Sequence, residues 1–370
     1  MTLVFVVILV ALVFTYTNGF HDTANSIATV VGTKVLTPRQ AILLATVTNL
    51  GGAMVGAAVA KTIASGLVDS DVVPAASSSH MLIGALIGAI LWNLLTWYVG
   101  LPSSSSHALV GGLCGSAFAA AHGNLGAIVW AKAPAVGKHW WDGGGILYKV
   151  VVPMVVSPVL GLVIAFAVMC GLYFILRNWR PLTVTRVFGK LQLLSSAYMG
   201  FSHGTNDAQK TMGIISLALV AATKAGTFDQ LPGWLGFFRT PEGADPKSQH
   251  IALWIKVVCA LTMALGTAVG GWRIIKTLGH KLVKLQPVHG FAAETSAATV
   301  LFVTAEMGMP VSTTHVITTS IMGVGAAKRL NALKWGVVER IVWAWILTLP
   351  ATAGIGYALT RVIQLAGWIQ

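Results

Sequence analysis

The stretch Asn18-Gly19-Phe20-His21-Asp22-Thr23-Ala24-Asn25 places polar side chains in the middle of a long apolar run. Residues 3–14 before it are hydrophobic, and the chain turns apolar again over residues 27–31. Such a run should span a membrane, where an aspartate costs so much to desolvate that it is a candidate functional residue. Residues 2–31 are too many for one straight crossing at about 1.5 Å per residue. We therefore expect a break at Asn18-Gly19, where glycine frees the backbone.

The composition indicates a membrane protein. Of the 370 residues, 55% are hydrophobic and only 9% charged, with a mean hydropathy of +0.77, whereas a soluble domain carries about 25% charged residues. The net charge of +13 sits on residues between the apolar spans, which indicates membrane topology and no nucleic-acid partner. The three cysteines form no CxxC pair and no Cys/His ligand spacing. We expect no metal site and no resident cofactor.

The polar stretch recurs as Gly200-Phe201-Ser202-His203-Gly204-Thr205-Asn206-Asp207-Ala208-Gln209-Lys210. Asp22 corresponds to Asp207, and Asn25 corresponds to Lys210, each three residues further on. Likewise, Pro102-Ser103-Ser104-Ser105-Ser106-His107 has the same internal spacing as Pro310-Val311-Ser312-Thr313-Thr314-His315. The chain therefore contains an internal repeat. In each copy we expect a short helix to start at the hydroxyl cluster that follows the proline.

The fold class predicted from this pattern is an all-α polytopic membrane protein with two inverted-topology repeats, broken helices and short re-entrant-type helices. The chain has room for about 10–12 transmembrane segments. Residues 1–176 form the first repeat, residues 177–190 a basic cytoplasmic hinge, and residues 191–370 the second repeat, with an extracytoplasmic loop at 223–250. We expect about five membrane crossings per repeat. Because five is odd, the second repeat enters the membrane from the side opposite to the first. Inverted repeats with broken helices are typical of secondary transporters, with the substrate near the membrane midplane.

The basic residues indicate the orientation. With both termini extracytoplasmic, 14 of the 24 Lys and Arg residues fall on the cytoplasmic side of the cell membrane. These are Lys34, Arg39, Arg177, Arg180, Arg186, Lys190, Arg273, Lys276, Lys281, Lys284, Lys328, Arg329, Lys334 and Arg340. Lys210 alone is left inside the membrane.

These motifs resemble the inorganic phosphate transporter (PiT) family, whose duplicated motif has the general form Gly-Ala-Asn-Asp-Val-Ala-Asn. The resemblance extends to Leu101-Pro102-Ser103-Ser104-Ser105-Ser106-His107, to Ala293-Glu294-Thr295-Ser296-Ala297-Ala298-Thr299 and to Met309-Pro310-Val311-Ser312-Thr313-Thr314-His315. It covers nearly the whole chain apart from residues 122–145 and 223–250. It implies that the chain is no enzyme but imports phosphate, driven by a cation gradient, by alternating access. The substrate residues it implies are Asp22, Asn25, Ser104, Ser105, Ser106, Asn206, Asp207, Lys210, Ser312, Thr313 and Thr314.

These residue types suit phosphate. The two carboxylates can accept hydrogen bonds from P–OH groups or bind a co-transported cation, and sulfate lacks such a proton. The asparagine and hydroxyl side chains are neutral donors. Free amides at the start of a helix, with the positive end of its dipole, form an anion site.

One departure from the family pattern concerns the coupling ion. The second motif usually ends in Asn, and Lys210 stands there instead. That form is similar to the bacterial low-affinity branch that works with protons or carries metal–phosphate complexes. We therefore predict proton coupling, with the Lys210 ammonium standing where sodium would balance charge. The coupling candidates are Asp22, Asp207, Lys210, Glu294, His107 and His315.

Alternatives stay open on the sequence alone. Lys210 and Asp207 could form a static ion pair, and His107 and His315 could orient the serines instead of relaying protons. Sodium-coupled phosphate symport, transport of a metal–phosphate complex and a sulfate permease of the same fold all fit the pattern. A passive channel also remains, whereas no nucleophile elbow or oxyanion loop supports a hydrolase. The expected partners are phosphate, a coupling cation (a proton, sodium, or a divalent metal with phosphate) and the lipid bilayer, with a homodimer left open.

Overall fold

The computed structural model describes residues 2–69, 71–229, 231–239 and 251–366, and within these ranges the protein is helical, with no strand. Residues 230 and 240–250 of the predicted loop at 223–250 lie outside the described residues. The helices of the first half are α1 (Thr2–Gly32), α2 (Pro38–Ala53), α3 (Ala58–Ser65), α4 (Ala75–Val99), α5 (Ser105–Ala120) and α6 (Val152–Leu176). Those of the second half are α7 (Pro181–Lys224), α8 (Leu253–Val269), α9 (Trp272–Lys276), α10 (Pro287–Glu306), α11 (Thr313–Lys328) and α12 (Trp335–Leu365).

The two halves have the same order of elements. Each begins with a long helix, continues with a bent pair and a further helix, and reaches a short helix before the closing one. Among the described residues, four helices are long and apolar enough to cross a membrane, and counting each bent pair as one span brings the number to six. The short helices α5 and α11 have 16 residues each, which is too few to cross the hydrocarbon core alone. The predicted all-α polytopic fold is confirmed.

The breaks lie in the second element of each half. Between α2 and α3 the chain bends by 68°, and between α8 and α9 by 58°. Gly56 and Gly270 have φ of +80° and +76° at these bends, a conformation that glycine adopts without steric cost. The side chain of Gln209 on α7 accepts hydrogen bonds from the amides of Val59 (2.9 Å) and Ala60 (3.3 Å) at the start of α3. A buried helix end is thereby satisfied inside the membrane.

The predicted break at Asn18-Gly19 is wrong, because α1 runs without interruption from Thr2 to Gly32. Gly19 has a different role there. A Cβ atom at this position would lie 2.5 Å from the carbonyl oxygen of Met263 on α8. The small residue lets two helices approach closely, which is how helices associate in lipid. The corresponding helix α7 is also unbroken over its 44 residues.

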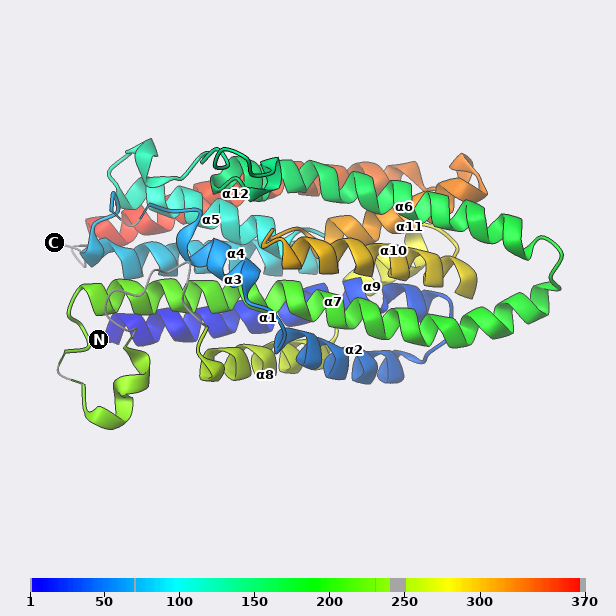
Figure 1. Ribbon diagram of the computed structural model, residues 1–370, viewed down its shortest axis with the longest axis horizontal. Helices are drawn as coiled ribbons and strands as arrows, with labels where there is room; N and C mark the ends of the chain where they lie inside the picture. The colour runs from blue at the N-terminus through cyan, green and yellow to red at the C-terminus, as the bar shows by residue number, and fades with distance from the viewer. Residues whose placement is uncertain (1, 70, 230, 240–250, 367–370) are drawn as a thin grey trace.

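The two repeats are packed crosswise (Figure 1). Helix α1 packs on α8, and α7 packs on α2. In the same way α5 packs on α12, and α6 packs on α11. Most of the extensive helix contacts therefore join elements of different repeats, and the centre of the molecule is built from both.

The two ends of the molecule differ in their loops. Helix α1 begins and α12 ends at the same end, whereas the α1–α2, α6–α7 and α11–α12 turns lie at the opposite end (Figure 1). These turns carry basic residues, among them Lys34, Arg177, Arg180 and Arg329. One end of the molecule is therefore strongly basic.

The neighbours Gly51 and Gly52 on α2 offer a matched test of the close packing. A Cβ at Gly52 would lie 2.0 Å from the carbonyl oxygen of Phe201 on α7, whereas a Cβ at Gly51 meets nothing within 4 Å. We expect Gly52→Ala to destabilise the purified protein by about 1–3 kcal/mol through overpacking and Gly51→Ala to leave its thermal unfolding temperature unchanged or higher. Equal unfolding temperatures for the two variants would contradict this packing.

Candidate functional site

The centre of the molecule holds two aspartates, one from each long helix. Asp22 on α1 and Asp207 on α7 are each 1% exposed. Asp22 lies 2.7 Å from His21 Nδ1 and accepts a hydrogen bond of 2.5 Å from the Ser105 hydroxyl. Thr314 donates a longer one of 3.4 Å. The aspartate of the first repeat therefore binds both short helices.

Asp207 forms the one Lys–carboxylate ion pair among the described residues. Lys210 Nζ lies 2.5 Å from Asp207 Oδ1, three residues along the same helix. His203 Nε2 lies 3.2 Å from the other carboxylate oxygen. The Lys210 ammonium also donates to the hydroxyl of Ser106 on α5. This single side chain thus joins the second repeat's aspartate to the first repeat's hydroxyl cluster.

The short helices α5 and α11 point their N-termini at this centre. Ser106 donates to the carbonyl oxygen of Val311, just before α11, at 3.1 Å. Asn25 donates from its amide to the hydroxyls of Thr313 (3.2 Å) and Thr314 (2.9 Å). The start of a helix carries unpaired amides and about half a positive elementary charge. Two such ends meeting beside hydroxyls can bind an anion.

Ser104 and Ser312 have a local structural role in this conformation. Each is the N-cap of its helix and accepts a hydrogen bond from the amide three residues on, at 3.1 Å from His107 N and 3.2 Å from His315 N. This is the usual capping geometry. Their predicted contact with substrate stays a prediction.

The two histidines of the hydroxyl motifs contact each other. The rings of His107 and His315 are 4.7 Å apart, edge to face, and His315 also stacks on Trp345 at 4.0 Å. His107 Nδ1 and His315 Nε2 have no hydrogen-bond partner among the described residues. The pair lies where the starts of α5 and α11 meet.

Two predicted site residues lie apart from the central contacts. Glu294 on α10 is fully buried and accepts hydrogen bonds from Thr29, Ser195 and Gln192, the last at 3.2 Å. It forms a separate polar cluster with α1 and α7 and bonds none of the central residues. Asn206 is fully buried, and neither its amide nitrogen nor its oxygen finds a partner in the described part of the chain.

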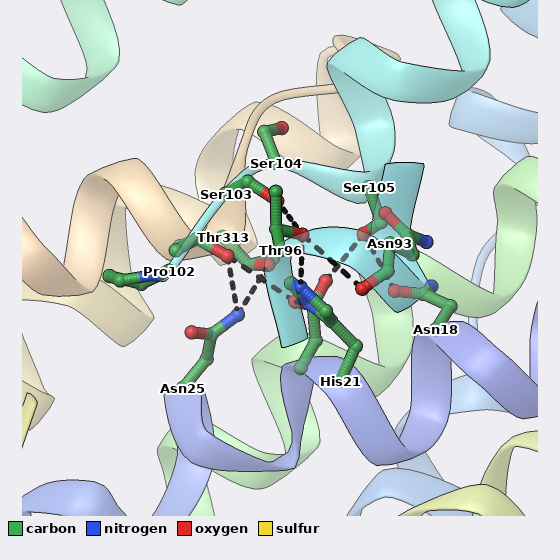
Figure 2. Close-up of polar contacts among 12 residues, drawn as sticks. Asn18, His21, Asn25, Asn93, Thr96, Pro102, Ser103, Ser104, Ser105 and Thr313 are labelled. Atoms are coloured by element: carbon green, nitrogen blue, oxygen red, sulfur yellow. Dashed lines mark hydrogen bonds and ion pairs between the residues drawn. The ribbon is translucent and has the colours of Figure 1, made fainter. Parts of the chain in front are cut away.

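Several residues around the aspartates were absent from the predicted site (Figure 2). Asn18 accepts from the Ser105 hydroxyl at 2.6 Å and reaches Asp207 at 3.5 Å. His21 contacts the hydroxyl of Thr96 at 3.1 Å, which in turn accepts from Ser103 at 2.8 Å. The available signal was position, because Asn18, His21 and Asn25 follow a spacing of three to four residues and so share one face of α1.

Three of these side chains could hold a cation. One ligand atom each from Asp22, His203 and Asp207 lie within 4.8 Å of one another, and all three residues are buried. Carboxylate oxygens and an imidazole are ordinary metal ligands. The sequence predicted no resident metal but a co-transported cation at the carboxylates. The structure brings Asp22 and Asp207 together with His203, beside the starts of α5 and α11.

The comparisons with known proteins agree with this geometry. A model of the phosphate transporter family matches residues 18–184 and again residues 176–356. The chain belongs to the phosphate transporter family. The first match contains Asp22 and the first hydroxyl motif, and the second contains Asp207 and the second hydroxyl motif.

Bacterial relatives cover nearly the whole chain. A protein of Bacillus subtilis named probable low-affinity inorganic phosphate transporter is 38% identical over 96% of this chain and 95% of its own. One from Rhizobium meliloti with the same name is 40% identical over 94% of this chain and 92% of its own. A solved structure titled the sodium-dependent phosphate transporter superposes with a TM-score of 0.79 at 25% identity, over 99% of this chain and 100% of that chain. The predicted family and membrane fold are confirmed.

The buried ion pair predicts a stability pattern. Asp207→Asn leaves the Lys210 ammonium buried without a carboxylate partner, which costs about 3–5 kcal/mol. The double variant Asp207→Asn/Lys210→Met removes both charges, and we expect it to recover most of that loss. Thermal unfolding of the purified protein in detergent measures both. A single variant as stable as the parent, or a double variant no better than the single, would contradict the pairing.

Proposed function

We propose that this protein imports inorganic phosphate across the cell membrane by proton symport, alternating access to the buried central site. The observation that carries the proposal is the Lys210 contact with Asp207 and Ser106, which puts a fixed cation between the two repeats. The names of the bacterial relatives support phosphate as the substrate. The basic end faces the cytoplasm in this proposal, because cytoplasmic loops carry an excess of Lys and Arg, and both termini are extracytoplasmic.

The charges of the site favour a proton as the coupling ion. The carboxylates of Asp22 and Asp207 and the ammonium of Lys210 give the site a net formal charge of −1 when its histidines are counted as uncharged. The starts of α5 and α11 together offset about one unit. Phosphate entering as a monoanion then leaves about one negative charge in a water-poor interior, where an unbalanced charge is costly. One proton taken up with phosphate restores the balance.

Selection against sulfate follows from the same residues. A P–OH group can donate to Asp22 or Asp207, whereas sulfate at neutral pH has no proton to donate and would bring its oxygens against buried acceptors. A buried acceptor left without its donor can discriminate strongly between ligands of the same shape. The hydroxyls of Ser105, Thr313 and Thr314 would serve either anion.

Transport of a metal–phosphate complex is the second candidate. It is favoured by the cation-binding set of Asp22, His203 and Asp207. A divalent metal with the phosphate dianion is neutral and needs no proton. In this alternative the metal is part of the substrate and leaves the site with phosphate.

Uptake of radiolabelled phosphate into proteoliposomes tests the proposal. We expect saturable accumulation under an inward proton gradient, its loss on adding a protonophore, and no response to a sodium gradient. Retained uptake with a metal chelator present and no competition by sulfate are expected as well. Uptake that requires a divalent metal would favour the metal complex, and no uptake under either gradient would refute phosphate symport.

Lys210→Asn tests the role of the fixed cation, because it copies the side chain that Asn25 places in the other repeat. We expect proton-driven uptake to fall at least about tenfold, the loss of one charge-assisted contact, and sodium to stimulate what remains. Lys34→Asn removes a lysine that lies in the α1–α2 turn, away from the central site, and serves as the control. If Lys210→Asn kept the parent's rate and cation response, the lysine would be a structural residue.

A further inference from the structure

A cavity lies at the basic end of the molecule, away from the central site. It has a volume of about 230 Å³ and opens between the end of α6, the start of α7 and the start of α10. Its lining is largely apolar, with Met169, Leu176, Val184 and Val288 among the residues. Arg177 and Tyr173 are among the residues that line it, and the Tyr173 hydroxyl also contacts His289 Nε2 at 2.9 Å. Within the described part of the chain, no acidic residue lines the cavity.

The charge around this cavity is positive. Arg177 has no carboxylate within ion-pair distance among the described residues, and its guanidinium lies over the Phe174 ring at 4.8 Å. Arg180 and Arg186 follow on the turn and on α7. Across the whole hinge, residues 177–190, the sequence has four basic residues and no acidic one. An anion approaching this cavity therefore meets a guanidinium that no carboxylate of the described chain neutralises.

The surroundings are those of a membrane interface. Tyr173 and Trp179, both lining the cavity, are 39% and 46% exposed, and such aromatic residues concentrate at the level of lipid headgroups. Phe174 and Ile175 on α6 are 68% and 66% exposed, an apolar surface suited to acyl chains. Figure 1 shows the α6–α7 turn at the far end of the molecule, beyond α10.

We propose that this cavity binds an anionic phospholipid of the cytoplasmic leaflet. Its phosphate contacts Arg177, its glycerol region lies beside Tyr173, and its acyl chains follow the exposed apolar face of α6. Basic pockets between transmembrane helices on the cytoplasmic side commonly bind such headgroups. The apolar lining selects a lipid over free phosphate, because a small, fully hydrated anion gains nothing from burying Met169 and Leu176.

Native mass spectrometry of the purified full-length protein tests this site with phosphatidylglycerol and phosphatidylcholine as probes. We expect phosphatidylglycerol to bind more tightly, and Arg177→Gln to weaken it about fivefold, the size of one charge contact at a membrane surface. Arg180→Gln removes the same charge three residues away, from a side chain that does not line the cavity, and should have a smaller effect. Inorganic phosphate at millimolar concentration should not displace the lipid.

A further variant separates a cavity site from general surface charge. Leu176→Trp narrows the cavity, keeps every basic residue, and should lower phosphatidylglycerol binding as Arg177→Gln does. Equal binding of the two lipids, equal losses in the two arginine variants, displacement by free phosphate, or full binding in Leu176→Trp would each overturn the proposal. A second copy of the chain covering α6 in place of lipid would also overturn it, and the same spectra report the oligomeric state. The outcome is independent of phosphate transport, because the readout is lipid binding.

Discussion

A buried charge in a membrane must be paired, and this constraint governs the centre of the protein. Lys210 is 1% exposed and has a carboxylate and a hydroxyl within reach. The unbroken helix α7 supplies the carboxylate, because residues three apart lie on one face. The hydroxyl of Ser106 comes from the other repeat, so the start of α5 has to lie beside α7 at the centre of the molecule.

Crosswise packing determines which parts of the chain can separate. Because α1 packs on α8 and α7 packs on α2 through glycines, neither repeat is a compact body by itself. The starts of α5 and α11 are joined differently, by the His107–His315 ring contact and the hydrogen bond from Ser106 to Val311. Ring contacts and single hydrogen bonds break at a smaller cost than interlocked backbones. Any opening of the central site therefore breaks these contacts before it separates α1 from α8 or α2 from α7.

The sequence predicted that Asp22 and Asp207 face each other, because polar side chains buried in lipid need polar partners, and it left the Lys210–Asp207 ion pair open as an alternative. The sequence did not locate the helix breaks, because a glycine can have either of two roles. Gly56 adopts a positive φ at a bend, whereas Gly19 lets α1 approach α8 closely. The sequence also could not assign different roles to neighbouring serines. Ser104 caps the helix, whereas Ser105, one position further along the same helix, donates to Asp22. The Glu294 cluster shows a further limit, because position along the chain does not tell which buried polar groups lie together.

The resemblance between this structure and a solved structure titled the sodium-dependent phosphate transporter does not determine the coupling ion. A TM-score of 0.79 reports the path of the backbone, whereas the balance of charge in the site depends on single side chains. Asn25 and Lys210 occupy equivalent places in the two repeats, so the scaffold tolerates either a neutral amide or an ammonium there. Lys210 pairs with the carboxylate of Asp207, whereas Asn25 leaves the carboxylate of Asp22 to the His21 ring and the Ser105 hydroxyl. The proposed proton coupling therefore depends on one side chain, and a shared backbone is compatible with either coupling ion.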